Sequence, residues 1–214
     1  LVKRLTQTAI GASIERIVVY SRGEHTQEAM ARKFTDHRLR FLIGDVRDYD
    51  RLVLACKGID TIIHTAALKV VPKCEYDPIE AINTNITGTA NVIRAAIACN
   101  VERVVGISSD KAVAPINLYG ATKFASEKLL VSANHLSGSP GYPVGSGHTC
   151  FSAVRYGNVA NSQGSIIPLL LNCKKQGLSY PLTDARMTRF WITLEQAVAV
   201  VLNAIQAMSG GEIF

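Results

Sequence analysis

The chain has 214 residues, of which 48% are hydrophobic and 19% are charged, enough to bury a full-sized core in one domain or slightly more. No apolar run approaches the roughly 18 residues that a membrane-spanning helix needs, and the first residues lack the order of a secretory signal, so we expect a cytoplasmic protein without membrane contact. The formal net charge of +6 could suit nucleic acid, but the basic residues are scattered and form no run, and a phosphorylated small-molecule partner explains the charge equally well.

Short β-branched runs alternate with longer amphipathic segments along the chain. The runs predicted as strands are residues 16–20, 40–43, 61–64, 103–107 and 150–155. Each run is continuously apolar, as in strands covered on both faces. A helix is expected over residues 79–98, with one buried stripe made of Ile82, Ile86, Ala90, Ile93 and Ile97. This alternation predicts an α/β fold with a doubly wound parallel sheet, Rossmann-like, and helices on both faces.

One internal segment and the ends of the chain depart from this alternation of strands and helices. Residues 137–148 are dense in Gly, Ser and Pro, which predicts a surface loop before the last strand. The chain opens inside a helical pattern, and no G-x-G-x-x-G turn precedes it. We therefore expect a dinucleotide fold without its first strand and Gly-rich turn, with a dinucleotide-binding domain at residues 1–157. Residues 158–214 are expected to form part of a smaller substrate domain with a returning helix.

The strongest local motif is a tyrosine and a lysine at i and i+4, Tyr119 and Lys123, in a predicted helix. That spacing places both side chains on one face, about one turn apart. A lysine cation beside a phenol lowers the pKa of the tyrosine from about 10 and lets it act as a base near neutral pH. Y-x-x-x-K also occurs often by chance, so on the motif alone an ordinary surface pair explains it equally well.

An acid and a base lie side by side in the loop after the fourth predicted strand, at Asp110 and Lys111. Ligands of such sheets bind outside the carboxyl ends of the strands, so this loop is where a substrate would lie. An elimination across two carbons requires an acid and a base of different pKa. A solvated turn would have the same composition, and it is the better reading of this pair taken alone.

Three successive predicted strands end in residues that suit a dinucleotide. These are Ser21 and Arg22, then Asp45 and Val46, then Thr65, Ala66 and Ala67. An acidic residue would bind the ribose of NAD, whereas Ser21 with Arg22 suits the 2′-phosphate of NADP. Asp45 would face the adenine, although an aspartate after a strand is by itself more often a helix cap. Their joint occurrence favours NADP as the cofactor.

Metal, acyl-transfer and P-loop chemistry find no support. The five cysteines are widely spaced and contain no C-x-x-C pair, which indicates reduced packing thiols. The five histidines show no metal-ligand spacing. G-x-S-x-G and Walker lysine motifs are missing from the sequence.

The chain resembles the inverting UDP-N-acetylglucosamine 4,6-dehydratases of pseudaminic acid biosynthesis, in the extended short-chain dehydrogenase/reductase family, through SSDKAVAPINLYGATKFASEKLLVSAN, AVRYGNV and DARMTRFWITLEQA. The resemblance extends upstream through VVYSRGEHTQEAM, RFLIGDVRDYDRL and HTAALKVVPKCEYDP, so it covers almost the whole chain except residues 137–148. It implies a lyase that uses NADP, takes UDP-N-acetylglucosamine as substrate and forms a homo-oligomer.

The resemblance implies a role for each of the four catalytic candidates. Tyr119 would take the proton of the sugar 4-hydroxyl, and Lys123 would bind the ribose and lower the pKa of Tyr119. Hydride would pass from C4 to the nicotinamide. Lys111 would then remove the C5 proton while Asp110 protonates the departing 6-hydroxyl. Return of the hydride at C6 and reprotonation of C5 on the other face would complete the inversion.

Binding roles also follow from the resemblance. Substrate contacts are implied at Lys69, Asn158, Ser165 and Arg189. Of these, Arg189 would meet the diphosphate, unless it forms an ordinary surface salt bridge. Val159 would lie beside the nicotinamide. Two positions depart from the family pattern, because Thr26 stands where a lysine is common and Val70 stands where a histidine is expected. These departures bear on cofactor affinity and on the shape of the pocket.

Two other functions remain open at this stage. A nucleotide-sugar 4-epimerase of the same superfamily would use Tyr119, Lys123 and a bound cofactor, but it would not need the Asp110–Lys111 pair. A non-catalytic dinucleotide-sensing protein on the same fold would be expected to lose Tyr119 or Lys123. The sequence keeps all four residues, which favours the dehydratase.

Overall fold

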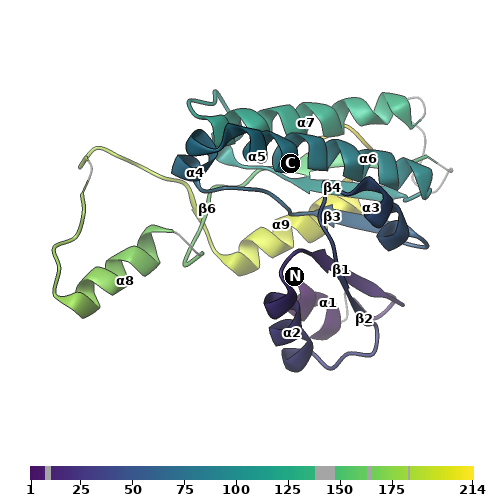
Figure 1. Ribbon diagram of the computed structural model, residues 1–214, viewed down its shortest axis with the longest axis horizontal. Helices are drawn as coiled ribbons and strands as arrows, with labels where there is room; N and C mark the ends of the chain where they lie inside the picture. The colour runs from purple at the N-terminus through teal and green to yellow at the C-terminus, as the bar shows by residue number, and fades with distance from the viewer. Residues whose placement is uncertain (8–10, 138–147, 163–164, 183) are drawn as a thin grey trace.

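The computed structural model of the chain describes residues 1–7, 11–137, 148–162, 165–182 and 184–214. Parallel strands follow one another with helices between them (Figure 1). The central strands are β1 (Ile17–Ser21), β2 (Leu39–Ile43), β3 (Thr61–His64), β4 (Arg103–Ile107) and β5 (Cys150–Val154). β1 pairs with β2, and β3, β4 and β5 pair in that order, all in parallel. The predicted strands are confirmed to within one residue at each end, and so is the α/β fold class.

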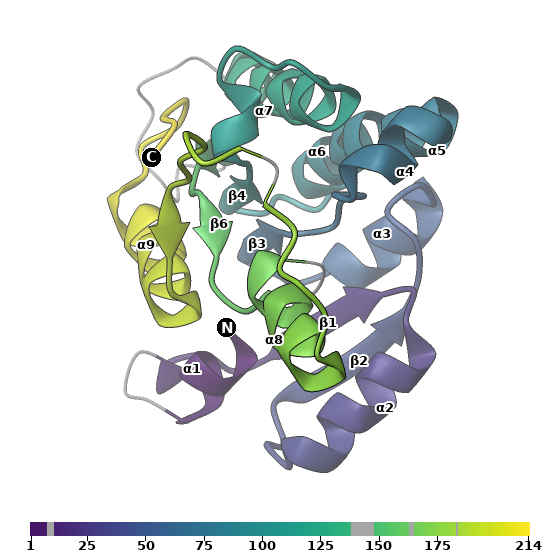
Figure 2. The ribbon, with the colours of Figure 1, turned by 90° about the vertical axis from the view of Figure 1, so that its left-hand side faces the viewer.

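Helices cover both faces of the β3–β4–β5 sheet. The helices are α1 (Val2–Gln7), α2 (Glu24–Lys33), α3 (Tyr49–Cys56), α4 (Val71–Tyr76), α5 (Pro78–Ile82), α6 (Gly88–Ala98), α7 (Leu118–Leu136), α8 (Ile166–Gln176) and α9 (Leu194–Ala207), with a π-helical turn η2 (Asn83–Thr87) and a 3-10 turn η3 (Asp110–Ala112). α6 and α7 pack on one face with α3 beside α6, and α9 packs on the other (Figures 1 and 2). α8 lies away from the sheet at the end of an extended connection (Figure 1).

The sheet is buried on both faces because side chains of its strands alternate between two cores. Val104 of β4 and Phe151 of β5 point into the core beneath α6 and α7. Val105 and Val154 point into the second core, beneath α9. All four side chains are fully buried. Parallel strands covered in this way read as continuous apolar runs, which is why the sequence identified them.

The predicted buried stripe of the helix over residues 79–98 is mostly wrong. Ile93 is buried, but Ile82 is 40% exposed and Ile86, Ala90 and Ile97 are only half-buried. The buried face instead runs through polar Thr84, Asn85 and Thr89. The cause is the π-helical turn η2, since the wider i→i+5 turn shifts the residues that face the sheet and α7. Hydrogen bonds satisfy the side chains of Asn85 and Thr89, whereas Thr84 Oγ1 has no hydrogen-bond partner in the described residues.

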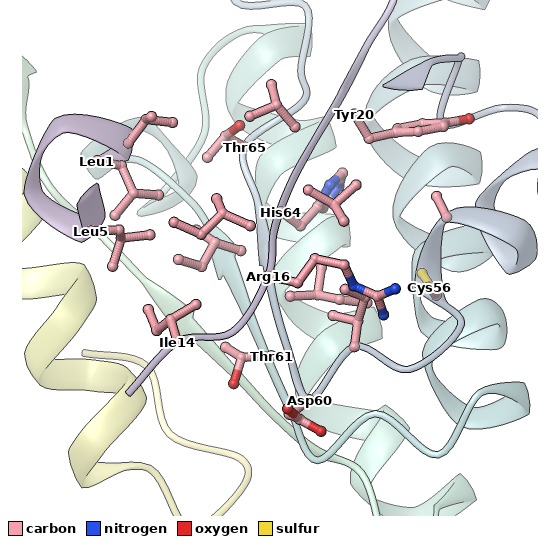
Figure 3. Close-up of a pocket in the computed structure, with 18 of the residues that line it drawn as sticks. Leu1, Leu5, Ile14, Arg16, Tyr20, Cys56, Asp60, Thr61, His64 and Thr65 are labelled. Atoms are coloured by element: carbon pink, nitrogen blue, oxygen red, sulfur yellow. The ribbon is translucent and has the colours of Figure 1, made fainter. Parts of the chain in front are cut away.

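The sheet is interrupted between β1 and β3. Within the described part of the chain, β1 pairs only with β2 and β3 only with β4. A cavity of about 1340 Å³ occupies the interruption. Figure 3 shows Leu1, Leu5 of α1, Tyr20 of β1, and Thr61 and His64 of β3 around it. A doubly wound sheet places its first strand at this position.

The end of the chain returns to the sheet after α9. Ile213 forms a parallel bridge with Ala153 of β5, and Phe214 exchanges backbone hydrogen bonds with Ala153 and Arg155. Two short strands, β6 (Asn158–Val159) and β7 (Trp191–Ile192), form a separate parallel pair. The predicted division at residue 157 stays a prediction. The predicted surface loop falls mostly on residues 138–147, which lie outside the described residues.

Candidate active site

The first turn of α7 brings Tyr119 close to the loop after β4. The helix begins after Asn117, whose side chain accepts a hydrogen bond of 2.9 Å from the Gly120 amide. A Cβ atom at Gly120 would lie only 2.3 Å from the carbonyl oxygen of Lys111, so glycine is what permits this approach. Lys123 follows one turn later on the same face of α7.

Tyr119 is partly buried, and this environment disfavours its phenolate. Burial raises its pKa above the ordinary value of 10.0. A hydrogen bond with the Ser109 side chain acts in the opposite direction, and the negative charge of Asp110 raises the pKa further. The prediction that Lys123 lowers the pKa of Tyr119 is therefore wrong for the protein without a ligand.

Lys123 explains this outcome, because its ammonium group is engaged elsewhere. The side chain is only 6% exposed and donates a hydrogen bond to the carbonyl oxygen of Ile107, at the end of β4. Burial lowers the pKa of Lys123 to about 8, and the carboxylate of Glu127 opposes that shift. Lys123 is thus a buried amine that titrates closer to neutral pH than an exposed lysine does.

The structure brings Asp110 and Lys111 together with Asn158. Lys111 Nζ lies 3.1 Å from Asp110 Oδ1, and it donates a hydrogen bond of 2.9 Å to Asn158 Oδ1. Ser109 caps the η3 turn and also donates to Asp110 Oδ1, at 2.9 Å. The pair is therefore held in place after the carboxyl end of β4 and is not a freely solvated turn.

Val159 follows Asn158 in β6, which is aligned by its pairing with β7. The Asn158 amide donates to the carbonyl oxygen of Phe190 at 2.8 Å, and Arg189 immediately precedes that residue. The Arg189 side chain is exposed and donates to the carbonyl oxygen of Thr188. Backbone pairing thus links the segment of Arg189 to that of Asn158.

A second group of predicted residues gathers at the ends of β1 and β2. Arg22 is 52% exposed, and its guanidinium lies 3.6 Å from Asp45 Oδ2. Asp45 also accepts two hydrogen bonds from the Arg47 side chain, which hold its pKa below the ordinary range although burial opposes them. Gln27 donates to the Ser21 hydroxyl at 2.9 Å and fixes it. Val46 is buried in the core and lines the cavity.

Thr65, Ala66 and Ala67 follow β3, and sequence reasoning missed the residue that holds this segment. Asn85, in η2, accepts a hydrogen bond of 2.8 Å from the Leu68 amide. Its side-chain amide donates to the Leu68 carbonyl oxygen and to the hydroxyl of Thr122 in α7, each at 2.9 Å. It is only 1% exposed. A polar residue inside the predicted apolar helix was the available signal.

The structure does not bring every predicted site residue to the Tyr119–Lys111 region. Among the described residues, the side chains of Lys69, Ser165 and Arg189 make no hydrogen bond or ion pair with the four catalytic candidates. Lys69 is exposed between β3 and α4. Ser165 precedes α8, and its hydroxyl is buried without a hydrogen-bond partner in the described residues.

A nicotinamide dinucleotide fits the residues of both groups. The half-exposed guanidinium of Arg22 can meet a phosphate, because its ion-pair partner Asp45 lies 3.6 Å away and is also paired with Arg47. Lys123 Nζ has three donor hydrogens and gives one to Ile107. Tyr20, Thr65 and Ala66 line the end of the cavity nearest the carboxyl ends of β1 and β3, where such sheets bind ligands.

Among the described residues, the cysteines and the possible metal ligands form neither a disulfide nor a metal cluster. All five cysteines are free thiols, four of them buried, as predicted. No cluster of three or more His, Cys, Asp or Glu side chains with metal-binding geometry occurs among the described residues. A search of the same residues finds no helix with the length and hydropathy to cross a bilayer.

Comparison with known proteins relates this arrangement to enzymes of nucleotide sugars. The model of the family described as "Polysaccharide biosynthesis protein" matches residues 1–214. The chain is 48% identical over 200 residues to the UDP-N-acetylglucosamine 4,6-dehydratase (inverting) of Campylobacter jejuni, which covers 93% of this chain and 58% of the relative. It is 42% identical over 214 residues to the UDP-glucose 4-epimerase of Rickettsia rickettsii, covering 100% of the chain and 61% of the relative. The chain thus spans about three fifths of the length of these relatives.

Solved structures show the same fold. Pen from Bacillus thuringiensis superposes with a TM-score of 0.86 at 44% identity, covering 93% of this chain and 60% of that one. DesIV from Streptomyces venezuelae, a dTDP-glucose 4,6-dehydratase with NAD and TYD bound, superposes with a TM-score of 0.83 at 22% identity, covering 95% of this chain and 66% of that one. The second likeness concerns the fold alone.

Proposed function

The chain belongs to the polysaccharide biosynthesis protein family, and from that premise we propose that it is a lyase that dehydrates UDP-N-acetylglucosamine across C4–C6 with inversion at C5. The product would be UDP-2-acetamido-2,6-dideoxy-β-L-arabino-hexos-4-ulose, the first intermediate toward pseudaminic acid. The relatives from Campylobacter jejuni carry the name of this activity. The proposal concerns the whole protein, since the chain spans 58% of those relatives.

The observation that carries the proposal is the contact of Lys111 with both Asp110 and Asn158. An epimerase needs a base for the 4-hydroxyl and a cofactor, and Tyr119 with Lys123 meets that need. Elimination of water also needs a base at C5 and an acid at the 6-hydroxyl. The 3.1 Å contact between Lys111 Nζ and Asp110 Oδ1 places an amine and a carboxyl group side by side, the two kinds of group that this elimination needs.

In the proposed mechanism, Tyr119 takes the proton of the sugar 4-hydroxyl, and Lys123 binds the adjacent ribose. A bound nicotinamide dinucleotide would accept hydride from C4 and return it at C6. Lys111 takes the C5 proton, which the C4 ketone has made acidic, while Asp110 protonates the departing 6-hydroxyl so that it leaves as water. A proton delivered to the other face of C5 completes the inversion. Asn158 orients the amine of Lys111 through their hydrogen bond.

We assign NADP as the cofactor because of Arg22. Its half-exposed guanidinium follows β1, at the position where an acidic residue would bind the ribose hydroxyls of NAD. DesIV, which shares the fold, holds NAD in its solved structure. The choice of NADP therefore rests on the residues of this chain and on the resemblance of its sequence.

We also expect a homo-oligomer, as the resemblance implies. Tyr76 and Ile79, on α4 and α5, are 88% and 69% exposed. Light scattering coupled to size-exclusion chromatography measures the mass directly. A monomer at micromolar concentration would contradict this expectation.

Proton NMR of UDP-N-acetylglucosamine incubated with the purified protein and NADP in deuterated water tests the proposed function. A 6-deoxy-4-keto product with deuterium at C5 and L-arabino configuration is the expected result. Conversion to the galacto isomer without solvent deuterium would instead identify a 4-epimerase, the activity named for the relative from Rickettsia rickettsii. The D-xylo configuration at C5 would contradict inversion.

A further inference from the structure

We propose that Glu127 is a positioning residue that ties together the three segments of the candidate site and provides the counter-charge for Lys123. Its effect on turnover rests on the proposed function, whereas its effect on Lys123 does not. Glu127 was not singled out in the sequence, where it reads as one more charged residue of a helix. In the structure its side chain is only 1% exposed, the most buried carboxylate among the described residues.

Glu127 is held by partners from two other segments. Its Oε1 atom accepts a hydrogen bond from Ser108 Oγ and one of 2.8 Å from Arg155 Nε. Its Oε2 atom accepts a hydrogen bond of 2.5 Å from Arg155 Nη2, so the guanidinium binds in a bidentate manner. Both carboxylate oxygens are therefore engaged, and the side chain has a single defined position.

These partners lie at the bases of the two loops that carry the chemistry. Ser108 leads from β4 into the turn that holds Asp110 and Lys111. Arg155 directly follows β5 and leads to Asn158. Glu127 lies on α7, two turns after Tyr119. One carboxylate thus links the tyrosine helix to the acid–base loop and to the loop that orients Lys111.

Glu127 also faces Lys123, one turn earlier on α7. The groups around that ammonium are the Ile107 carbonyl on β4 and His64 on β3. Burial, with the charge of Lys123, lowers the pKa of His64 to about 3, so this ring is neutral at pH 7. Arg155, directly after β5, is paired with Glu127 and partly exposed. Glu127 is the group that raises the pKa of Lys123 against the effect of burial.

A purely architectural ion pair is the competing explanation. Buried pairs contribute little net stability, because desolvation offsets their attraction, yet removing one partner is costly. Loss of stability in a Glu127 variant therefore cannot separate the two explanations. The charge state of Lys123 can, since an architectural role leaves it unchanged when the fold is intact.

The test follows the side-chain NMR signals of isotope-labelled lysine across pH, with the Lys123 signal assigned by its absence in Lys123→Met. Glu127→Gln keeps the shape but removes the charge, so the midpoint of Lys123 should fall by about one pH unit from the value of about 8. Ser108→Ala is the matched control, because it removes one hydrogen bond to the same carboxylate and keeps the charge. Its midpoint should stay within a few tenths of a unit of the wild type.

An unchanged midpoint in Glu127→Gln, or equal shifts in Glu127→Gln and Ser108→Ala, would overturn the proposal. Should Glu127→Gln fail to fold, the double variant Glu127→Leu, Arg155→Met replaces the buried pair by apolar residues of similar volume. The titration midpoint of Lys123 is then measured in that variant. With UDP-N-acetylglucosamine, Glu127→Gln should lower kcat roughly 10-fold or more with little change in KM. If the wild type fails to turn over this sugar, the proposed function is wrong, while the lysine titration still decides the role of Glu127.

Discussion

The ammonium group of Lys111 donates a hydrogen bond of 2.9 Å to Oδ1 of Asn158, 47 residues further along the chain. The same ammonium lies 3.1 Å from Asp110 Oδ1. One oxygen on each side thus fixes the direction of the amine. A lysine that removes a proton from carbon needs such orientation, because its long side chain is otherwise flexible.

Replacing Asn158 should impair the C5 step in particular. Asn158→Ala removes a hydrogen bond to a charged group, worth about 1.5–3 kcal/mol, so we expect roughly 10- to 100-fold slower dehydration. Exchange of the C5 proton with deuterated water, followed by NMR, measures this step. Ser132→Ala, on the exposed side of α7, serves as the control and should exchange at the wild-type rate. Equal rates in Asn158→Ala and the control would contradict the orienting role.

Variants of Lys111 and Tyr119 should distinguish the oxidation at C4 from the elimination of water that follows it. Lys111→Ala keeps the base for the 4-hydroxyl, so a single turnover should still form reduced nicotinamide. Tyr119→Phe removes that base and should form almost none, a loss of about 100-fold or more. Stopped-flow absorbance of the reduced nicotinamide measures both variants. Indistinguishable traces would show that the two roles are assigned wrongly.

Arg22 should determine the preference for NADP over NAD. Arg22→Ala removes a charge-assisted contact to the 2′-phosphate, so the Kd for NADP should rise roughly 10- to 100-fold while that for NAD stays nearly constant. Isothermal titration calorimetry measures both constants. Arg32→Ala is the matched control, since Arg32 is an exposed arginine on α2 paired with Glu28. A parallel loss of affinity for both cofactors would argue against 2′-phosphate recognition.

Gly120 should tolerate no side chain. A Cβ atom would lie 2.3 Å from the Lys111 carbonyl oxygen, and that oxygen belongs to the backbone, so α7 or η3 must shift. Gly120→Ala should cost about 1–3 kcal/mol of unfolding free energy and lower turnover through the displaced pair. Chemical denaturation and steady-state kinetics measure the two effects. Ala121→Ser, at the exposed neighbouring position, should change neither.

His64 should make the protein sensitive to mild acid. Burial lowers its pKa from 6.5 to about 3. Below about pH 6.5 the unfolded chain binds a proton that the folded chain refuses, so stability present above that pH is lost progressively as the pH falls towards 3. Urea unfolding at pH 7 and pH 5 should show a smaller loss in His64→Gln than in the wild type. The exposed His25→Gln should keep the wild-type loss.

Sequence patterns predicted well whatever depends on neighbours along the chain. β-Branched apolar runs marked β1 to β5 because strands buried on both faces leave no polar positions. The i, i+4 spacing placed Tyr119 and Lys123 on one helical face, and adjacency placed Asp110 beside Lys111. The buried stripe of α5 and α6 failed, because a π-helical turn and hydrogen-bonded Asn85 changed which residues face inward.

The sequence by itself determined the order of strands and helices, the family resemblance and the four catalytic candidates, since these follow from local periodicity and spacing. The tertiary structure decided that Asn158 orients Lys111, that Glu127 joins Ser108 and Arg155, and that the pKa of Tyr119 is raised. Each of these depends on contacts between segments far apart in the chain and on exclusion of water. Such effects arise only when the layers pack, so no local pattern records them.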